Sequence, residues 1–141
     1  MSRRKGRILA FQALYSYDVG EMPEEQLLKL EWNDESDGDS QDFARLLIGG
    51  TIKHIDDIDA NIKKHLTGKW EIERINKVSL AILRLSVYSL MYQTDTHPSI
   101  VIDEAIDIAK EYGADDSFRF INAVLDNIRK ELTPSDDKKQ E

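Results

Sequence analysis

The segment KEYGADDSFRFINAVLDNI, residues 110–128, places two adjacent carboxylates and a serine hydroxyl just after a glycine. Such carboxylates bind divalent cations when further acidic ligands converge on them, and no other acids in the chain have a recognisable spacing for that. A helix cap explains the same residues. Gly113 has the place of a helix end, and Asp116 or Ser117 lies where the next helix needs an oxygen to accept a backbone N–H. We therefore predict a cap, whose N–H groups could still bind phosphate or a ribose hydroxyl.

The other residue types that carry chemistry show no catalytic pattern. Cysteine is absent, which excludes thiol nucleophiles and cysteine-ligated zinc and fits a reducing cytoplasm. The three histidines, His54, His65 and His97, have no partner histidine four residues away, and no glycine-rich phosphate loop is present. The sequence therefore predicts a protein that is not an enzyme and that has no metal or cofactor.

A cluster of positive charge near the N-terminus is the strongest physical indication of function. Four cations fall within five residues: Arg3, Arg4, Lys5 and Arg7. The net charge of the chain is −8, so the remaining residues together carry −12. A basic arm on an acidic body favours local contact with a polyanion. On charge alone, a basic terminus without a binding role is an equally good interpretation.

Aromatic side chains near these charged groups offer faces on which bases could stack. Tyr15 lies two helical turns after Arg7 on the same predicted helix. Stacking of a base on an aromatic ring contributes about 1–3 kcal/mol. Phe118 lies beside the predicted cap but belongs to an apolar stripe, so we expect it in the core, with partial exposure as the alternative.

The intervals between apolar residues predict an all-α protein of six or seven helices around one core. The longer predicted helices cover residues 3–19, 41–66, 73–92, 99–112 and 117–132, and a short helix follows Pro23. Gly49-Gly50 interrupts the second of these, and each glycine costs about 1 kcal/mol relative to alanine. We therefore expect another backbone to approach closely there. The helix over 73–92 is apolar around most of its circumference, which predicts a central position.

Capping and loop residues divide the chain further. Ser2 and Ser99 are predicted to cap helices, and Thr67-Gly68 to end one. Residues 31–42 are rich in acids and predict a solvated loop. We expect one domain over residues 1–132, followed by a mobile charged tail over 133–141. No apolar run approaches 18 residues and no secretory signal is recognisable, so we expect no membrane segment.

Three segments carry a resemblance to a known family. They are SRRKGRILAFQALYSYD (2–18), NKVSLAILRLSVYSLMY (76–92) and PSIVIDEAIDIAKEYGADDSFRFINAVLDNI (98–128). In this order they resemble the NusB family of bacterial transcription antitermination factors, and they cover most of residues 2–132. The last segment is the most specific, since it combines Asp-Glu-Ala, Ala-Lys, Gly-Ala-Asp-Asp-Ser and Phe-Ile-Asn.

The resemblance implies an all-helical fold of two small bundles without catalytic activity. It also implies a partner, a small-subunit ribosomal protein that doubles as a transcription factor, and a ligand, single-stranded boxA RNA of nascent ribosomal RNA. The complex is expected to join other Nus factors on RNA polymerase and to suppress premature termination in the cytoplasm. Members of the family occur as monomers and as dimers, so a homodimer stays open.

The family's motifs assign expected RNA-binding residues in this sequence. They are Arg3, Arg4, Lys5, Arg7, Tyr15, Asp116, Ser117, Arg119 and Phe120. The arm would bind phosphates, and the residues around the last cap would contact bases or sugars. Ser79 departs from relatives that carry a charged residue at this place, so contacts that need that charge are in doubt.

Two functions of other classes remain as alternatives. One is a helical protein-interaction module whose arginines only support solubility. The other is a stand-alone relative of the NusB-like domain that precedes some RNA cytosine methyltransferases, although no glycine-rich cofactor site or cysteine nucleophile is present here. Substitution of the four arm cations with alanine separates RNA binding from the first alternative, because only RNA association should then fall.

Overall fold

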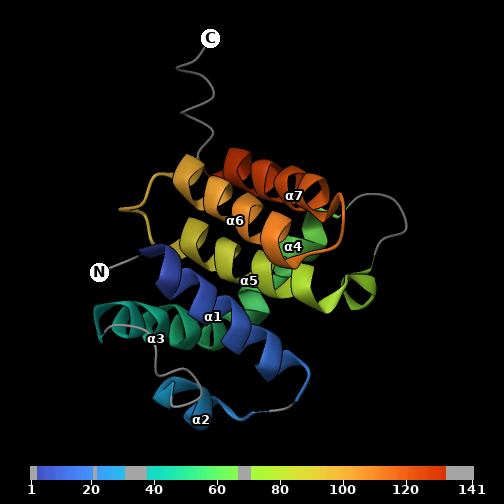
Figure 1. Cartoon of the computed structure of the whole chain (residues 1–141). Helices are drawn as coiled ribbons and strands as arrows, with labels where there is room; N and C mark the ends of the chain where they lie inside the picture. Colours follow the sequence, from blue (N-terminus) through green and yellow to red (C-terminus); the bar gives the residue numbers. More distant parts are fainter. Residues whose placement is uncertain (1–2, 21, 31–37, 67–70, 133–141) are drawn as a thin grey trace.

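Helices account for nearly all of the chain that a computed structural model describes, residues 3–20, 22–30, 38–66 and 71–132 (Figure 1). They are α1 (Arg3–Asp18), α2 (Glu24–Lys29), α3 (Gly38–Lys53), α4 (Ile55–Lys64), the short 3-10 helix η1 (Ile72–Arg74), α5 (Lys77–Tyr92), α6 (Pro98–Tyr112) and α7 (Ser117–Leu132). These ranges contain no strand, and the all-α prediction is confirmed. None of the helices in them is long and apolar enough to cross a membrane.

Helix α5 lies at the centre of the fold, as its composition predicted. It packs against α1, α3, α4, α6 and α7. In Figure 1, α6 and α7 cover one side of α5, and α1 and α3 cover the other. Ten consecutive positions of α5, residues 80–89, contain nine that are buried, so this helix buries nearly its whole circumference.

The break between α3 and α4 lies at His54, so the prediction that the glycine pair interrupts the helix is wrong. Both glycines lie inside α3. Gly50 is close to the ring of Tyr88 on α5, which is a side chain rather than the expected backbone. The ring of His54 stacks on Tyr92 at a centroid distance of 4.1 Å, so the break also places an aromatic contact.

The two neighbouring glycines give a matched pair of stability predictions. A Cβ at Gly50 would overlap the Tyr88 ring, whereas a Cβ at Gly49 would meet no atom within 4 Å. Gly50→Ala should therefore lower the free energy of unfolding by about 1–3 kcal/mol through overpacking. Gly49→Ala should raise it by up to about 1 kcal/mol, because alanine favours a helix interior. Urea unfolding of both variants checks this, and equal effects would contradict the Tyr88 contact.

Several other predicted boundaries differ from the observed ones. Helix α3 begins at Gly38, inside the predicted acidic loop. The predicted helix over 73–92 is divided into η1 and α5, and the Asn76 side chain caps α5 by accepting from the Ser79 N–H. His97, not Ser99, caps α6, with its ring nitrogen accepting from the Ser99 N–H at 3.1 Å. The predictions for Ser2, for residues 31–37, for Thr67-Gly68 and for the tail fall outside the described residues.

A largely buried ion cluster joins α5 to α1 and α4. Arg84 donates two hydrogen bonds of 2.9 Å to the Asp59 carboxylate, and its Nη1 lies 3.2 Å from Asp18 Oδ1. Burial alone would lower the pKa of Arg84, but the hydrogen bonds and charges of Asp59 and Asp18 outweigh it and raise that pKa. Arg84 is therefore charged. It compensates the charge of Asp59, and it shares the compensation of Asp18 with Lys77, whose Nζ lies 3.2 Å from Asp18 Oδ2.

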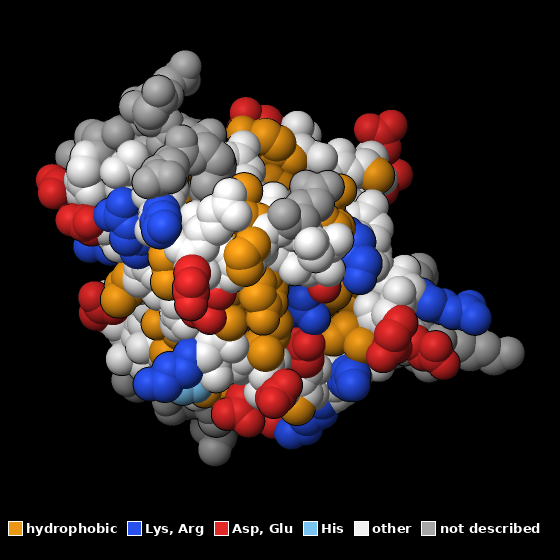
Figure 2. Space-filling view, turned by 90° about the horizontal axis from the view of Figure 1, so that it is seen from below, with side chains coloured by type: hydrophobic (Ala, Val, Ile, Leu, Met, Phe, Trp, Pro, Cys, Tyr) orange, Lys and Arg blue, Asp and Glu red, His pale blue; other side chains and the backbone are white. Residues whose placement is uncertain are grey.

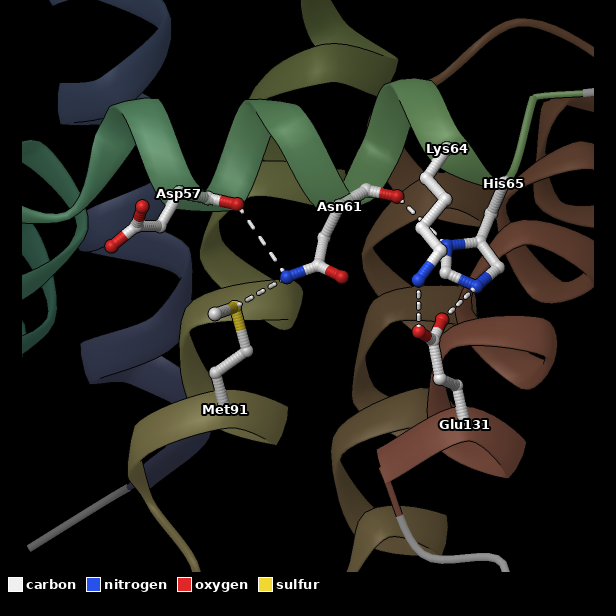
Figure 3. A network of polar contacts seen from close by, with 6 residues as sticks. All are labelled: Asp57, Asn61, Lys64, His65, Met91 and Glu131. Carbon is white, nitrogen blue, oxygen red and sulfur yellow. Dashed lines mark hydrogen bonds and ion pairs between the residues drawn. The ribbon is translucent and has the colours of Figure 1, made fainter.

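A second polar cluster links the C-terminal ends of α4 and α7 (Figure 3). Glu131 accepts from Lys64, and its other carboxylate oxygen lies 2.6 Å from His65 Nε2. His65 Nδ1 in turn lies 2.8 Å from the Asn61 carbonyl oxygen. The hydrogen bond from Lys64 is the main reason that the pKa of Glu131 lies below its usual value.

This lowered pKa predicts a pH dependence of stability. A carboxyl group whose pKa is lower in the folded chain stabilises the fold above its unfolded pKa, and that stabilisation is lost as the pH falls through the folded pKa. Glu131→Gln should therefore be less stable than the parent chain at pH 7, and the difference should shrink below about pH 4.5, the ordinary value for this group. Thermal unfolding between pH 3 and 7 measures it. Glu73→Gln, at an exposed position of η1, is the control.

Candidate nucleic-acid interface

The basic arm is the first turn of α1, and the start of α3 holds it in place. The guanidinium carbons of Arg3 and Arg7 lie 4.3 and 5.5 Å from the centre of the Phe43 ring. Gly6 lies between them, and a Cβ there would come within 2.7 Å of the same ring. A glycine at this position thus allows α1 to approach Phe43, and cation–π contacts hold the two arginines over it.

The four cations of the arm differ in exposure. Arg3, Arg4 and Lys5 are exposed, whereas Arg7 is 8% exposed. Burial lowers the pKa of Arg7, and the nearby Glu104 opposes this effect. Arg7 still carries its charge, because an arginine pKa lies far above neutral pH. The arm therefore presents three cations to solvent and holds the fourth beneath them.

Arg4 is paired with two carboxylates of α6. Its Nη2 donates to Asp107 Oδ2 at 2.6 Å, and its Nε lies 3.3 Å from Glu104 Oε2. The nearby carboxylate of Glu104, followed by that of Asp107, raises the pKa of Arg4. The sequence prediction did not include either carboxylate. Their spacing of three residues marks one face of a helix, but it does not identify the partner of that face.

Helices α1 and α6 run in the same direction (Figure 1), with the arm beside the middle of α6 and the α6–α7 turn at its C-terminal end. Arg4 of α1 lies beside Asp107 of α6. Further toward the C-terminal ends of these two helices, the ring centres of Phe11 and Tyr112 are 5.3 Å apart. Tyr15 is half-buried one turn beyond Phe11. From Asp107 to Gly113 the axis of α6 advances by about 9 Å. The predicted residues thus form two groups along one pair of helices.

The α6–α7 turn is predicted to hold a cap from Asp116 or Ser117, and it does not have the serine cap. Asp116 has a left-handed backbone with φ of 67°, a conformation that aspartate tolerates better than most residues. Its carbonyl accepts from the Arg119 N–H at 3.0 Å, and its carboxylate lies 3.4 Å from Arg119 Nε. Ser117 Oγ is buried without a hydrogen-bond partner, so the prediction that its hydroxyl caps the helix is wrong. Across the described residues, no group of three or more His, Asp or Glu side chains is arranged to hold a metal.

Two cations lie near the ring of Phe118 at the start of α7. Lys110 Nζ and the guanidinium carbon of Arg119 lie 4.9 and 5.3 Å from its ring centre. The ring is half-buried. It packs against the core, as expected, and part of it is exposed, as in the alternative. It lines an open cleft of about 500 Å³. The other residues of that cleft are Lys110, Gly113, Ala114, Asp115 and Asp116.

The two remaining predicted residues of α7 face a different cleft. Ser117 and Phe120 line a mainly apolar cleft of about 260 Å³ with Arg74, Ile75, Asn76 and Ser79. The buried, unpartnered hydroxyl of Ser117 belongs to this group. The predicted residues around the start of α7 are therefore divided: Asp116 lines one cleft, and Ser117 and Phe120 line the other.

Positive charge does not dominate the face seen in Figure 2. Lys and Arg side chains are interleaved there with Asp and Glu, and a strip of hydrophobic side chains runs between them. A surface of mixed sign attracts a polyanion only through local clusters. The geometry therefore provides an exposed basic first turn on α1, and an aromatic and polar surface at the start of α7.

Comparison with known proteins gives one family. The family model of NusB matches residues 4–130. The transcription antitermination protein NusB of Treponema denticola is 52% identical over 132 residues, which cover 92% of this chain and 96% of the relative. That of Nitratiruptor is 44% identical over 133 residues, with 93% and 94% covered. These relatives bear the name of an antitermination factor, in agreement with the expectation that the chain is not an enzyme.

Solved structures show the same fold. NusB of T. maritima has a TM-score of 0.86 at 34% identity, with 99% of this chain and 98% of that chain covered. A structure of the antitermination factors NusB and NusE in complex with dsRNA has a TM-score of 0.83 at 30% identity, with 92% and 96% covered. The NusB-like architecture predicted for this chain is thereby confirmed.

Proposed function

This chain belongs to the NusB family, and from that premise we propose that it binds boxA RNA of nascent ribosomal RNA transcripts together with a small-subunit ribosomal protein. The observation that carries the proposal is the exposed basic turn of α1, held on Phe43 in a fold that matches a NusB bound to NusE and RNA. In this role the chain acts in the cytoplasm, and residues 1–132 serve as one domain.

The arm supplies the phosphate contacts in this account. Arg3, Arg4 and Lys5 are exposed and lie within a single helical turn, so their side chains reach neighbouring phosphates. Arg7 supports the arm from beneath through Phe43. Each contact to a single-stranded phosphate adds about 0.7 to the salt slope of binding.

The start of α7 supplies contacts to bases and sugars. Arg119 is an exposed cation at this site, and its ion pair with Asp116 orients it across the turn. Phe120 and Ser117 offer an aromatic ring and a hydroxyl at the adjoining cleft, and Tyr15 lies toward this end of α1. Aromatic and polar groups next to a phosphate-binding helix suit unpaired bases, whose faces and edges are free.

The ribosomal partner, corresponding to NusE, completes the RNA-binding surface. The body of this chain is acidic, so the arm alone should bind RNA weakly. The pair then joins other Nus factors on RNA polymerase and suppresses premature termination. Self-association into a homodimer would compete with this assembly if it covered the arm.

Transcription in vitro tests the proposed activity. The template carries a boxA element upstream of a terminator, and the reactions contain polymerase and the other Nus factors. Readthrough should increase only when this chain and the ribosomal partner are both present, and only when boxA is intact. Binding to the partner without any effect on readthrough or RNA would instead favour a helical protein-interaction module.

A further inference from the structure

The proposed RNA site contains its own competitor for phosphate. We propose that the Asp107 carboxylate occupies the position of an RNA phosphate on Arg4, so that RNA must displace it, and that Asp107 thereby limits the affinity of the arm. This inference rests on the proposed function, because it concerns regulation of the same arm.

The contacts of Arg4 resemble those that a phosphate would make. Asp107 Oδ2 accepts from Nη2 at 2.6 Å, a short charge-assisted hydrogen bond. Glu104 Oε2 lies 3.3 Å from Nε, on the same edge of the guanidinium group. This edge can donate two parallel hydrogen bonds to the oxygens of one phosphate. Arg4 therefore cannot engage a phosphate through that edge while both carboxylates hold it.

The two carboxylates have different roles. The side chain of Asp107 is 50% exposed, so it returns to water readily when Arg4 leaves. Glu104 is 18% exposed, and its charge also acts on Arg7. Separation of Glu104 from both arginines would leave a mostly buried carboxylate without compensation. Asp107 is therefore the displaceable competitor, and Glu104 keeps the arm against α6.

The contribution of Arg4 to phosphate binding is reduced by the cost of breaking its pair with Asp107. Removal of the competing charge should increase affinity by the strength of one exposed ion pair, which is about three- to fivefold. The effect should depend on Arg4 and not merely on the loss of one negative charge.

Two neutralised variants test this with a fluorescent boxA RNA and the ribosomal partner in excess. Asp107→Asn should bind the RNA about three- to fivefold more tightly than the parent chain. Asp103→Asn removes the same charge from an exposed position of the same helix and reports the general electrostatic effect, which should be smaller. Circular dichroism verifies that both variants remain folded.

A double-mutant cycle assigns the effect to Arg4. In an Arg4→Ala background, Asp107→Asn should improve affinity no more than Asp103→Asn does. Equal effects of the two neutralisations in the parent chain, or weaker RNA binding by Asp107→Asn, would overturn the inference and leave the proposed function intact. Failure of the parent chain to bind boxA RNA even with the partner at low salt would overturn both.

Discussion

Replacement of Arg84 with alanine is expected to lower the free energy of unfolding by about 3–5 kcal/mol. The guanidinium group makes two hydrogen bonds to Asp59 and an ion pair with Asp18, and it is 12% exposed. Its removal takes from Asp59 the partner of two hydrogen bonds and leaves Asp18 paired with Lys77, whose Nζ lies 3.2 Å from Asp18 Oδ2. Because these carboxylates lie on α1 and α4, the loss weakens the contacts of both helices with α5. Urea unfolding monitored by circular dichroism measures the change.

Arg74→Ala is the matched control for this prediction. Arg74 and Glu71 form an ion pair in which both side chains are well exposed, and such pairs contribute about 0–1 kcal/mol. A triple variant that changes Arg84 to methionine and Asp18 and Asp59 to asparagine should recover part of the lost stability, since no buried charge then remains. A loss of under 1 kcal/mol for Arg84→Ala would contradict a central role for the cluster.

Replacement of Arg3, Arg4 and Lys5 with alanine should weaken boxA RNA binding by about 10- to 100-fold at low salt, the effect of three exposed charge pairs. The slope of log affinity against log salt should become shallower by about 2, since each phosphate contact accounts for about 0.7. Arg7 is kept, because it is buried against Phe43 and its loss would disturb the fold. Fluorescence anisotropy over a salt series measures both quantities.

A variant with the same loss of charge controls for long-range electrostatics. Lys29, Lys53 and Lys63 are exposed on α2, α3 and α4. Their replacement with alanine should weaken RNA binding far less and should change the salt slope little. Both triple variants should still bind the ribosomal partner. Equal losses for the two would show that net charge, and not the arm, determines affinity.

The sequence predicted the helices well because helical periodicity is local. Apolar residues at three- and four-residue intervals specify a helix and its buried face, and the nearly continuous apolar character of α5 specifies a central position. The glycine pair shows the limit of such reasoning. Glycine suggested a break by its propensity, but Gly50 lies in the helix because Tyr88 fills the space beside it, and Tyr88 is 38 residues away in the chain.

In the candidate site too, local patterns are predictable from the sequence and tertiary contacts are not. The sequence shows the basic arm as a cluster of positively charged residues, and the start of α7 as a cluster of acidic, hydroxyl and aromatic residues. The roles of particular residues depend on tertiary partners. Arg7 is buried because Phe43 lies against it, and Arg4 is paired because α6 presents Asp107. No spacing within a single segment predicts either contact.

The helix caps show that a short motif predicts where a helix begins better than it predicts which side chain caps it. Asp-Asp-Ser after a glycine correctly marked the junction between α6 and α7, yet Ser117 Oγ is directed into a buried site without a partner. Similarly, His-Pro-Ser marked the start of α6, but His97 makes the cap. Several polar residues compete for the same N–H groups at a helix start, and the backbone angles of the preceding turn decide which one reaches them.

The proposed RNA binding is tested by the affinity of this chain for a labelled boxA RNA, measured by fluorescence anisotropy with and without the ribosomal partner across a salt series. We predict weak, salt-sensitive binding by the chain alone, and a sharp increase in affinity with the partner that a scrambled RNA does not reproduce. Equal affinity for boxA and scrambled RNA with the partner present, or no binding to either at low salt, would contradict a specific boxA-binding role for this chain.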